Sequence, residues 1–229
     1  MLCNGHRQTM DGASPAFSTC VPFAMVRPPS KVADEVASRG RGLTAYVARL
    51  DRQFAAHGVG RADLNRVYAG AFVSFATYVE RSLERLFLGL VMGRFAASGI
   101  VPLVEIKSDK VAHAVVRGGR KYVDWLPYEQ HTAPRAEAFF ASGKPFTELG
   151  RPERRVLEHL GILRNAIAHE SAHSTRLFRR TFVEGRALPV DQQTPAGYLR
   201  GQHSPGLSRF ANTVNENVVV FRSLCGGRQ

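Results

Sequence analysis

Two overlapping motifs late in the chain contain side chains that could carry out chemistry. The segment RNAIAH places Arg164 five positions before His169, with Asn165 next to the arginine. The segment HESAH places His169 and His173 on either side of Glu170, in the His-Glu-x-x-His spacing found in zinc enzymes. Because the two motifs share His169 and imply different chemistry, the function depends on which of them forms the site.

The residues of RNAIAH could cleave RNA without a metal ion or any other cofactor. The reaction needs a base for the 2′-hydroxyl proton, an acid for the departing 5′-oxygen and a cation for the charge on phosphate. His169 can be the base or the acid because the unperturbed pKa of histidine lies near neutrality. Arg164 can bind phosphate through two N–H groups, and Asn165 can orient His169 or bind phosphate. The products would carry cyclic 2′,3′-phosphate and 5′-hydroxyl ends.

The segment HESAH predicts a different site. His169 and His173 would be zinc ligands, and Glu170 would be the general base of a zinc metallopeptidase. No third ligand is evident, because the extended His-x-x-Gly-x-x-His form of this motif is absent. We therefore predict that the chain has no metal site, and keep the zinc metallopeptidase as the less favoured alternative.

One long helix from Arg151 to Thr175 is expected to carry both motifs. Pro152 suits a first helical position, where its missing N–H would have no partner in any case. Apolar residues recur at the i, i+4, i+7, i+11 spacing of a helical stripe, which should pack on the core. The residues of this stripe are Val156, Leu160, Leu163 and Ile167.

The motif residues lie away from this apolar stripe. At about 100° per residue, Arg164, Asn165 and His169 fall on the remaining faces of the helix, around Ala168 and Ala172. Small residues let a second helix approach closely, and a two-fold interface presents one patch to itself. We therefore predict a homodimer in which two copies of Arg164 and of His169 meet in one cleft.

The segment LRNAIAH resembles the Arg-x4-His signature of the HEPN superfamily (higher eukaryotes and prokaryotes nucleotide-binding domains). The resemblance implies an all-α fold, a helical bundle with long amphipathic helices that dimerises along the motif helix. It also implies a metal-independent endoribonuclease of the toxin or antiphage type, with Arg164, Asn165 and His169 as catalytic residues. Some HEPN families place an acidic residue on an early helix near the active cleft, which makes Glu80 an auxiliary candidate.

A non-catalytic HEPN dimer is the main alternative, because some members of the superfamily bind nucleotide, RNA or a partner protein without cleaving RNA. Glu170 slightly favours this alternative, since it puts a negative charge beside a site for phosphate. Glu170 and His173 are kept as auxiliary candidates for the nuclease, with His173 as a second proton carrier. The resemblance also implies a cognate antitoxin or regulatory protein as a partner.

The chain is strongly basic, with 31 lysines and arginines against 19 acidic residues and a net charge of +12. This balance favours a polyanionic partner such as RNA. A basic surface that only keeps the protein in solution would give the same composition. The candidate RNA-binding residues are three arginines after the motif and two cations in the RGGRK turn: Arg176, Arg179, Arg180, Arg120 and Lys121.

The stretch before the motif helix has the least regular pattern. Tyr122, Trp125 and Tyr128 could stack on bases, but aromatic residues at this spacing more often belong to a core. Thr132 predicts the N-cap of a short helix, with Pro134 near the helix start.

The remaining pattern predicts one helical domain over residues 30–225, after an irregular segment over residues 1–29. Translation could start at Met25 within that segment. Residues 185–206 contain several glycines and prolines and are expected to form a long loop, which in a compact domain tends to be functional or mobile.

Two long helices are expected before the irregular stretch. The first begins at Ser30 and is interrupted near Gly40 and Gly42, and the second extends over residues 62–98. A final amphipathic helix begins near Leu207.

The cysteine usage and hydropathy favour a cytoplasmic protein. Cys3, Cys20 and Cys225 are far apart and form no Cys-x-x-Cys pair, which suits a reducing compartment. No run of roughly 18 or more apolar residues is present, so we predict no membrane span.

Overall fold

The protein is built almost entirely of α-helices, as predicted. The computed structural model describes residues 27–57, 60–169 and 171–226, and within these the only sheet is a two-stranded antiparallel one. Its strands are β1 (Gln202–Ser204) and β2 (Leu207–Ser208). The α-helices of the described residues are α1 (Ser30–His57), α2 (Arg61–Val91), α3 (Asp109–Arg117), α4 (Tyr128–Phe139), α5 (Arg151–His169), α6 (Ala172–Phe178), α7 (Pro195–Arg200) and α8 (Arg209–Leu224).

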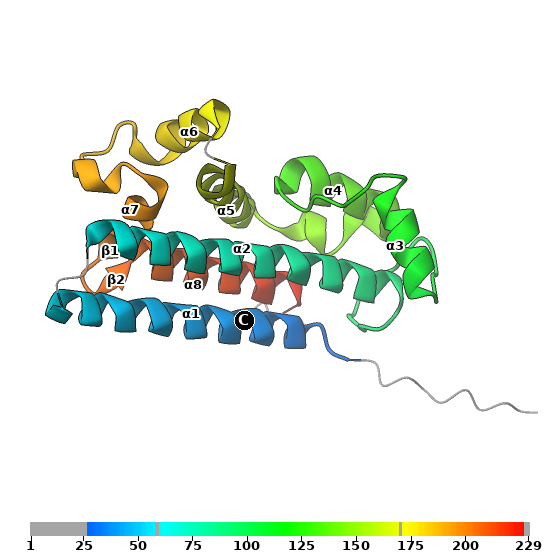
Figure 1. Cartoon of the computed structure of the whole chain (residues 1–229). Coiled ribbons are helices and arrows are strands. Elements are labelled where there is room, and N and C mark those ends of the chain that lie inside the picture. Colours follow the sequence, from blue (N-terminus) through cyan, green and yellow to red (C-terminus); the bar gives the residue numbers. More distant parts are fainter. Residues whose placement is uncertain (1–26, 58–59, 170, 227–229) are drawn as a thin grey trace, which may run out of the picture.

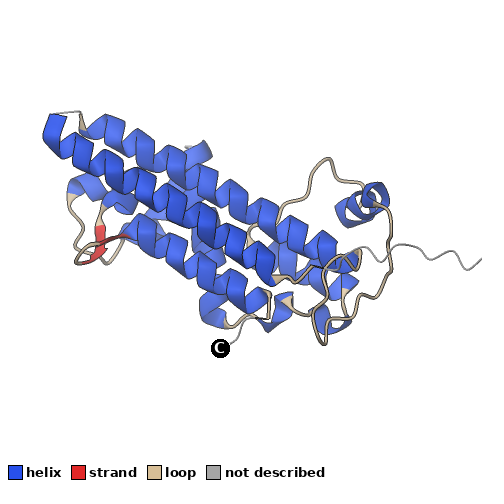
Figure 2. Cartoon of the chain, turned by 90° about the horizontal axis from the view of Figure 1, so that it is seen from below, coloured by secondary structure: helices blue, strands red, loops and turns tan. Residues whose placement is uncertain are grey.

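The long helices lie side by side, and α5 crosses them (Figure 1, Figure 2). Helix α1 packs against α2 and α8, while α5 packs against α2 and α8 from the other side of α2. Helix α2 is therefore enclosed, and its apolar side chains are fully buried. These include Phe72, Phe75, Val79, Leu83 and Leu86.

Helix α1 is continuous, so the predicted interruption near Gly40 and Gly42 is wrong. The two glycines have different surroundings. A Cβ atom on Gly40 would lie 2.5 Å from Cγ1 of Val214 on α8, whereas a Cβ on Gly42 would meet nothing within 4 Å. Gly40 therefore permits a close approach of α1 and α8.

Helix α2 ends at Val91 and not at residue 98. Gly93 has a φ of 65°, a left-handed conformation that glycine adopts without strain. The chain then turns back, and the ring of Phe95 lies directly on Gly89, where a Cβ atom would clash with it. This backward turn, which periodicity alone does not reveal, ends the helix early.

Helix α4 begins at Tyr128, so the predicted cap at Thr132 is wrong. The Thr132 side chain is buried, and its Oγ1 donates a hydrogen bond to the Trp125 carbonyl at 2.6 Å. Of the three aromatic residues expected in the core, Trp125 and Tyr128 are buried, but Tyr122 is 68% exposed.

The predicted long loop over residues 185–206 is also wrong, because it contains helix α7 and strand β1. The Thr194 side chain caps α7 by accepting a hydrogen bond from the Gly197 N–H at 3.2 Å, and Pro195 occupies the first turn. Tyr198 and Leu199 of α7 are buried. Helix α7 is thus part of the core.

Two expectations concern the chain before α1 and its hydropathy. The irregular segment and the start at Met25 lie almost wholly in residues 1–26, outside the described residues. Among the described residues, every helix is too short or too polar to cross a membrane.

Candidate functional site

Helix α5 carries the RNAIAH motif and is anchored by its leucines. Leu157, Leu160 and Leu163 are buried against the core, whereas Val156 and Ile167 are only partly buried at its edge. The buried line is thus rotated from the predicted stripe, because α5 packs against two helices at once. This packing turns Arg164 toward α2.

Arg164 meets Glu80, the acidic residue that the resemblance singled out on an early helix. Arg164 Nη2 lies 3.7 Å from Glu80 Oε2, and the two side chains are 32% and 21% exposed. Arg164 Nη1 also donates a hydrogen bond to Asn165 Oδ1 at 2.8 Å. The structure therefore brings together three predicted site residues from α2 and α5.

The pKa of the Glu80 carboxyl group is shifted in an unusual direction for a side chain that faces an arginine. Burial raises its pKa above the ordinary value. The positive charge of Arg164 acts in the opposite direction, while the negative charge of Asp124 raises the pKa further. Burial thus has a larger effect on the pKa of Glu80 than its ion pair with Arg164 has.

Asp124 is a residue of this site that sequence reasoning missed. It lies in the irregular stretch before α4, where no spacing pattern marks it. Arg135 fixes this stretch, since its Nη1 donates to the Asp124 carbonyl at 3.1 Å and its guanidinium lies 4.9 Å from the centre of the Trp125 ring. Tertiary contacts from α4 therefore bring Asp124 near Glu80.

His169 is the last residue of α5 and is exposed. Its side chain makes no hydrogen bond or ion pair with another described residue. It follows Arg164 by five residues, which is about 7.5 Å along the helix axis and about 140° around it. Within one copy, Arg164 and His169 thus lie on different faces of α5, and Asn165 shares the face of His169.

The predicted helix through Thr175 is wrong, because α5 stops at His169 and α6 begins at Ala172. Ser171 has extended backbone (φ −75°, ψ 153°), and its Oγ accepts a hydrogen bond from the Ser174 N–H at 3.1 Å. This cap breaks the helix between the two histidines of HESAH. Glu170 lies outside the described residues.

The break removes the geometric basis of the zinc alternative. His169 and His173 belong to different helices, so they are not one turn apart on one face. The described residues contain no group of three or more His, Cys, Asp or Glu side chains that could hold a metal ion. His173 is exposed on α6.

The predicted RNA-binding residues are all exposed. The three arginines among them do not lie on one continuation of the motif helix. Arg176 lies on α6, while Arg179 and Arg180 begin a π-helical segment over Arg179–Val183. Arg120 and Lys121 follow Gly118 and Gly119, whose positive φ values of 58° and 79° confirm the predicted turn. The charge of Arg120 acts with burial to lower the pKa of Arg135.

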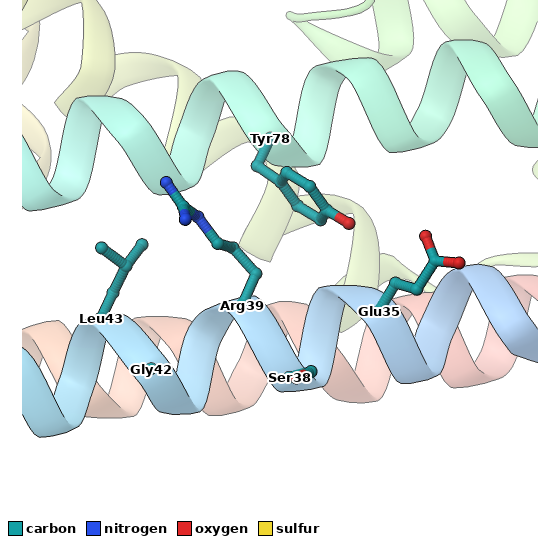
Figure 3. Close-up of a pocket in the computed structure, with 6 residues that line it drawn as sticks. All are labelled: Glu35, Ser38, Arg39, Gly42, Leu43 and Tyr78. Carbon is teal, nitrogen blue, oxygen red and sulfur yellow. The ribbon is translucent and has the colours of Figure 1, made fainter.

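Three hollows in the described surface lie elsewhere. One of about 560 Å³ lies between α1 and α2, where Tyr78 points toward α1 between Arg39 and Glu35 (Figure 3). A second, of about 880 Å³, shares Glu35 with it in its lining. A third of about 520 Å³ lies between α1 and α8. The RNAIAH residues line none of these three hollows.

Comparison of the chain with family models, with curated proteins and with solved structures finds no match. We therefore infer the function from the side chains of the site, their geometry and the charge of the chain.

Proposed function

We propose that this protein is a HEPN-like, metal-independent endoribonuclease that acts as a homodimer. The observation that carries the proposal is the position of Arg164, held by Glu80 of α2 beside Asn165, one turn before an exposed His169. A guanidinium and an imidazole on one helix of a strongly basic chain are suited to a phosphodiester substrate.

Dimerisation would complete the site. Arg164 and His169 of one copy point to different faces of α5, whereas a two-fold axis beside these faces would bring four such side chains into one cleft. Arg164 has five N–H donors, and only one of them donates a hydrogen bond to another described residue. Nη2 also faces the Glu80 carboxylate at 3.7 Å, and the remaining donors can bind the non-bridging oxygens of a phosphate.

In this cleft the two copies of His169 would divide the proton transfers. One neutral imidazole takes the proton of the 2′-hydroxyl, and the 2′-oxygen forms a bond to phosphorus. The bond from phosphorus to the 5′-oxygen breaks, and the other His169, in its protonated form, gives a proton to that oxygen. Arg164 stabilises the charge on the phosphate. The products are a 2′,3′-cyclic phosphate and a 5′-hydroxyl.

The biological role proposed from the resemblance is that of a toxin or antiphage effector, restrained by an antitoxin or another regulatory protein. The non-catalytic dimer is the second candidate. It is favoured by one observation: Arg164 already has two partners within its own chain, as a purely structural arginine would.

The test is cleavage of a mixed RNA substrate by the purified protein in excess EDTA. The wild type should cleave, and Arg164→Ala and His169→Ala should each lose about 100-fold or more in rate. Arg155→Ala on α5 and His203→Ala on β1 are controls of the same residue types, because both side chains are exposed and neither belongs to the predicted site. Both controls should cleave as the wild type does.

Other outcomes would replace the proposal. RNA binding without cleavage, weakened by Arg164→Ala, would support the non-catalytic dimer. Equal loss in a variant and its control would show that Arg164 and His169 have no special role. Activity that disappears only on chelation would restore a metal site.

A further inference from the structure

The largest of the three hollows lies between the start of α1 and the end of α2, and the chain before α3 closes one side of it. Its volume of about 880 Å³ is within the range of roughly 300–1,000 Å³ that is typical of small-molecule sites. The RNAIAH residues do not line this hollow, although Arg81 in its wall directly follows Glu80, the partner of Arg164.

Six lysines and arginines line this hollow, against three carboxylates. Each of these carboxylates lies close to a basic side chain. Arg85 pairs with Glu35, and Arg94 pairs with Asp109 at 2.8 Å. The third, Glu84, lies 3.7 Å from Nδ1 of His113.

Three cations of the hollow remain without an acidic partner among the described residues: Arg27, Lys31 and Arg81. They come from the chain before α1, the first turn of α1 and the last part of α2, and thus converge from separate elements. Unpaired cations around a concave surface attract anions, and arginine in particular binds phosphate through paired N–H donors.

The start of α1 adds to this positive field. Lys31 and Val32 of its first turn line the hollow, and that turn contains no acidic residue. The N–H groups of Lys31 and Val32 already donate to the carbonyls of Pro28 and Pro29, so the helix adds only the partial positive charge of its N-terminal end.

The floor of the hollow is apolar. Val32 and Leu88 are buried in it, and Met92 is partly buried beside them. The Phe95 ring lies on Gly89, because glycine leaves room for the ring against the helix backbone. A ligand that fits this floor has an apolar or flat part as well as a charged one.

We propose that this hollow binds a small organic phosphate. Its phosphate groups lie among Arg27, Lys31 and Arg81, and its apolar part lies on the floor near Leu88 and Phe95. A nucleoside diphosphate has both parts and a suitable size. The site shares no residue with the proposed nuclease site, so either proposal can fail without the other.

The experiment is titration calorimetry of the full chain at physiological salt with three probes: ADP, inorganic pyrophosphate and adenosine. ADP should bind, and pyrophosphate and adenosine should each bind at least about tenfold more weakly, because each lacks one half of the ligand. The double variant Lys31→Gln/Arg81→Gln should weaken ADP binding at least about tenfold. Its melting temperature checks that it folds.

Two control variants locate the ligand. Arg222→Gln removes an exposed cation with no described ion pair near the end of α8, and should bind ADP as the wild type does. Arg164→Ala should also keep ADP binding. Loss in Arg164→Ala would place the ligand at the RNAIAH motif and overturn this site.

Three further results would overturn the proposal. The first is no ADP binding at ADP concentrations up to about 1 mM. The second is undiminished ADP binding in the folded double variant, and the third is an equal loss of ADP binding in Arg222→Gln. Pyrophosphate that binds as tightly as ADP would overturn the role of the apolar floor.

Discussion

Replacing Glu80 by glutamine should stabilise the protein at neutral pH while impairing the proposed RNA cleavage. Burial raises the pKa of Glu80 in spite of Arg164, which means that the folded state binds the proton more tightly than the unfolded state does. The sign follows from linkage: the free energy of unfolding falls as pH rises through the interval between the ordinary and the raised pKa. Above this interval, the charged carboxylate is a net cost to stability.

The magnitude depends on two opposing terms. Unit charges about 4 Å apart attract by about 4 kcal/mol at an effective dielectric constant of about 20, and Glu80 and Arg164 lie 3.7 Å apart. Both side chains are partly exposed, so solvent screening leaves much less, and desolvation of the carboxylate exceeds what remains. Glutamine keeps the shape and an acceptor oxygen without that desolvation. We expect a gain of up to about 1 kcal/mol.

The assay is thermal unfolding of wild type and Glu80→Gln across the acidic to neutral range. At pH 7 the melting temperature of the variant should be up to about 2–4 °C higher, the shift that 1 kcal/mol gives in a chain of this size. The difference should vanish at low pH, where Glu80 is protonated. Glu216→Gln on exposed α8 surface is the matched control and should stay within about 0.5 kcal/mol of wild type.

The functional part of this prediction concerns Arg164. Without the carboxylate, Arg164 is held less firmly beside Asn165, so RNA cleavage by Glu80→Gln should fall by about tenfold although the protein is more stable. A variant that is less stable than wild type at pH 7 would refute the reasoning, because the ion pair would then outweigh burial. Cleavage equal to wild type would show that Glu80 does not position Arg164.

Two further predictions concern the elements that position the site. Gly40→Ala should destabilise the protein by about 1–3 kcal/mol, because its Cβ would press on the buried Val214. Gly42→Ala, with open space around it, should instead stabilise by up to about 1 kcal/mol; melting temperatures that change equally would contradict the close helix contact. Ser171→Ala should cost about 1 kcal/mol through loss of the α6 cap, while Ser171→Asp should retain it; equal melting temperatures of the two variants would show that the cap is unimportant.

The main helices could be predicted from periodicity, because an apolar stripe is a local property of the sequence. Their ends were harder to predict. The α2 terminus depends on Phe95 turning back onto Gly89, and the break after His169 depends on Ser171. A serine can continue a helix or cap the next one, and sequence pattern does not decide between them.

The residues of the candidate site also differ in how far the sequence reveals them. Arg164 and His169 were visible as a motif, and Glu80 only through the resemblance to HEPN proteins. Asp124 had no signal, because its position depends on tertiary contacts of Arg135 and not on spacing. Helix α7 did have a readable signal in Thr194 and Pro195, but the surrounding glycines and prolines concealed it.

The packing of α8 has a consequence for synthesis of the chain. Helix α8 contacts α1, α2 and α5, yet it is the last of these helices to leave the ribosome. Until it arrives, α1 lacks the partner that Gly40 fits, and α5 is supported by α2 without α8. Nascent chains thus hold the motif helix on an incomplete core. The core that supports α5 is therefore complete only after the chain has been translated through α8.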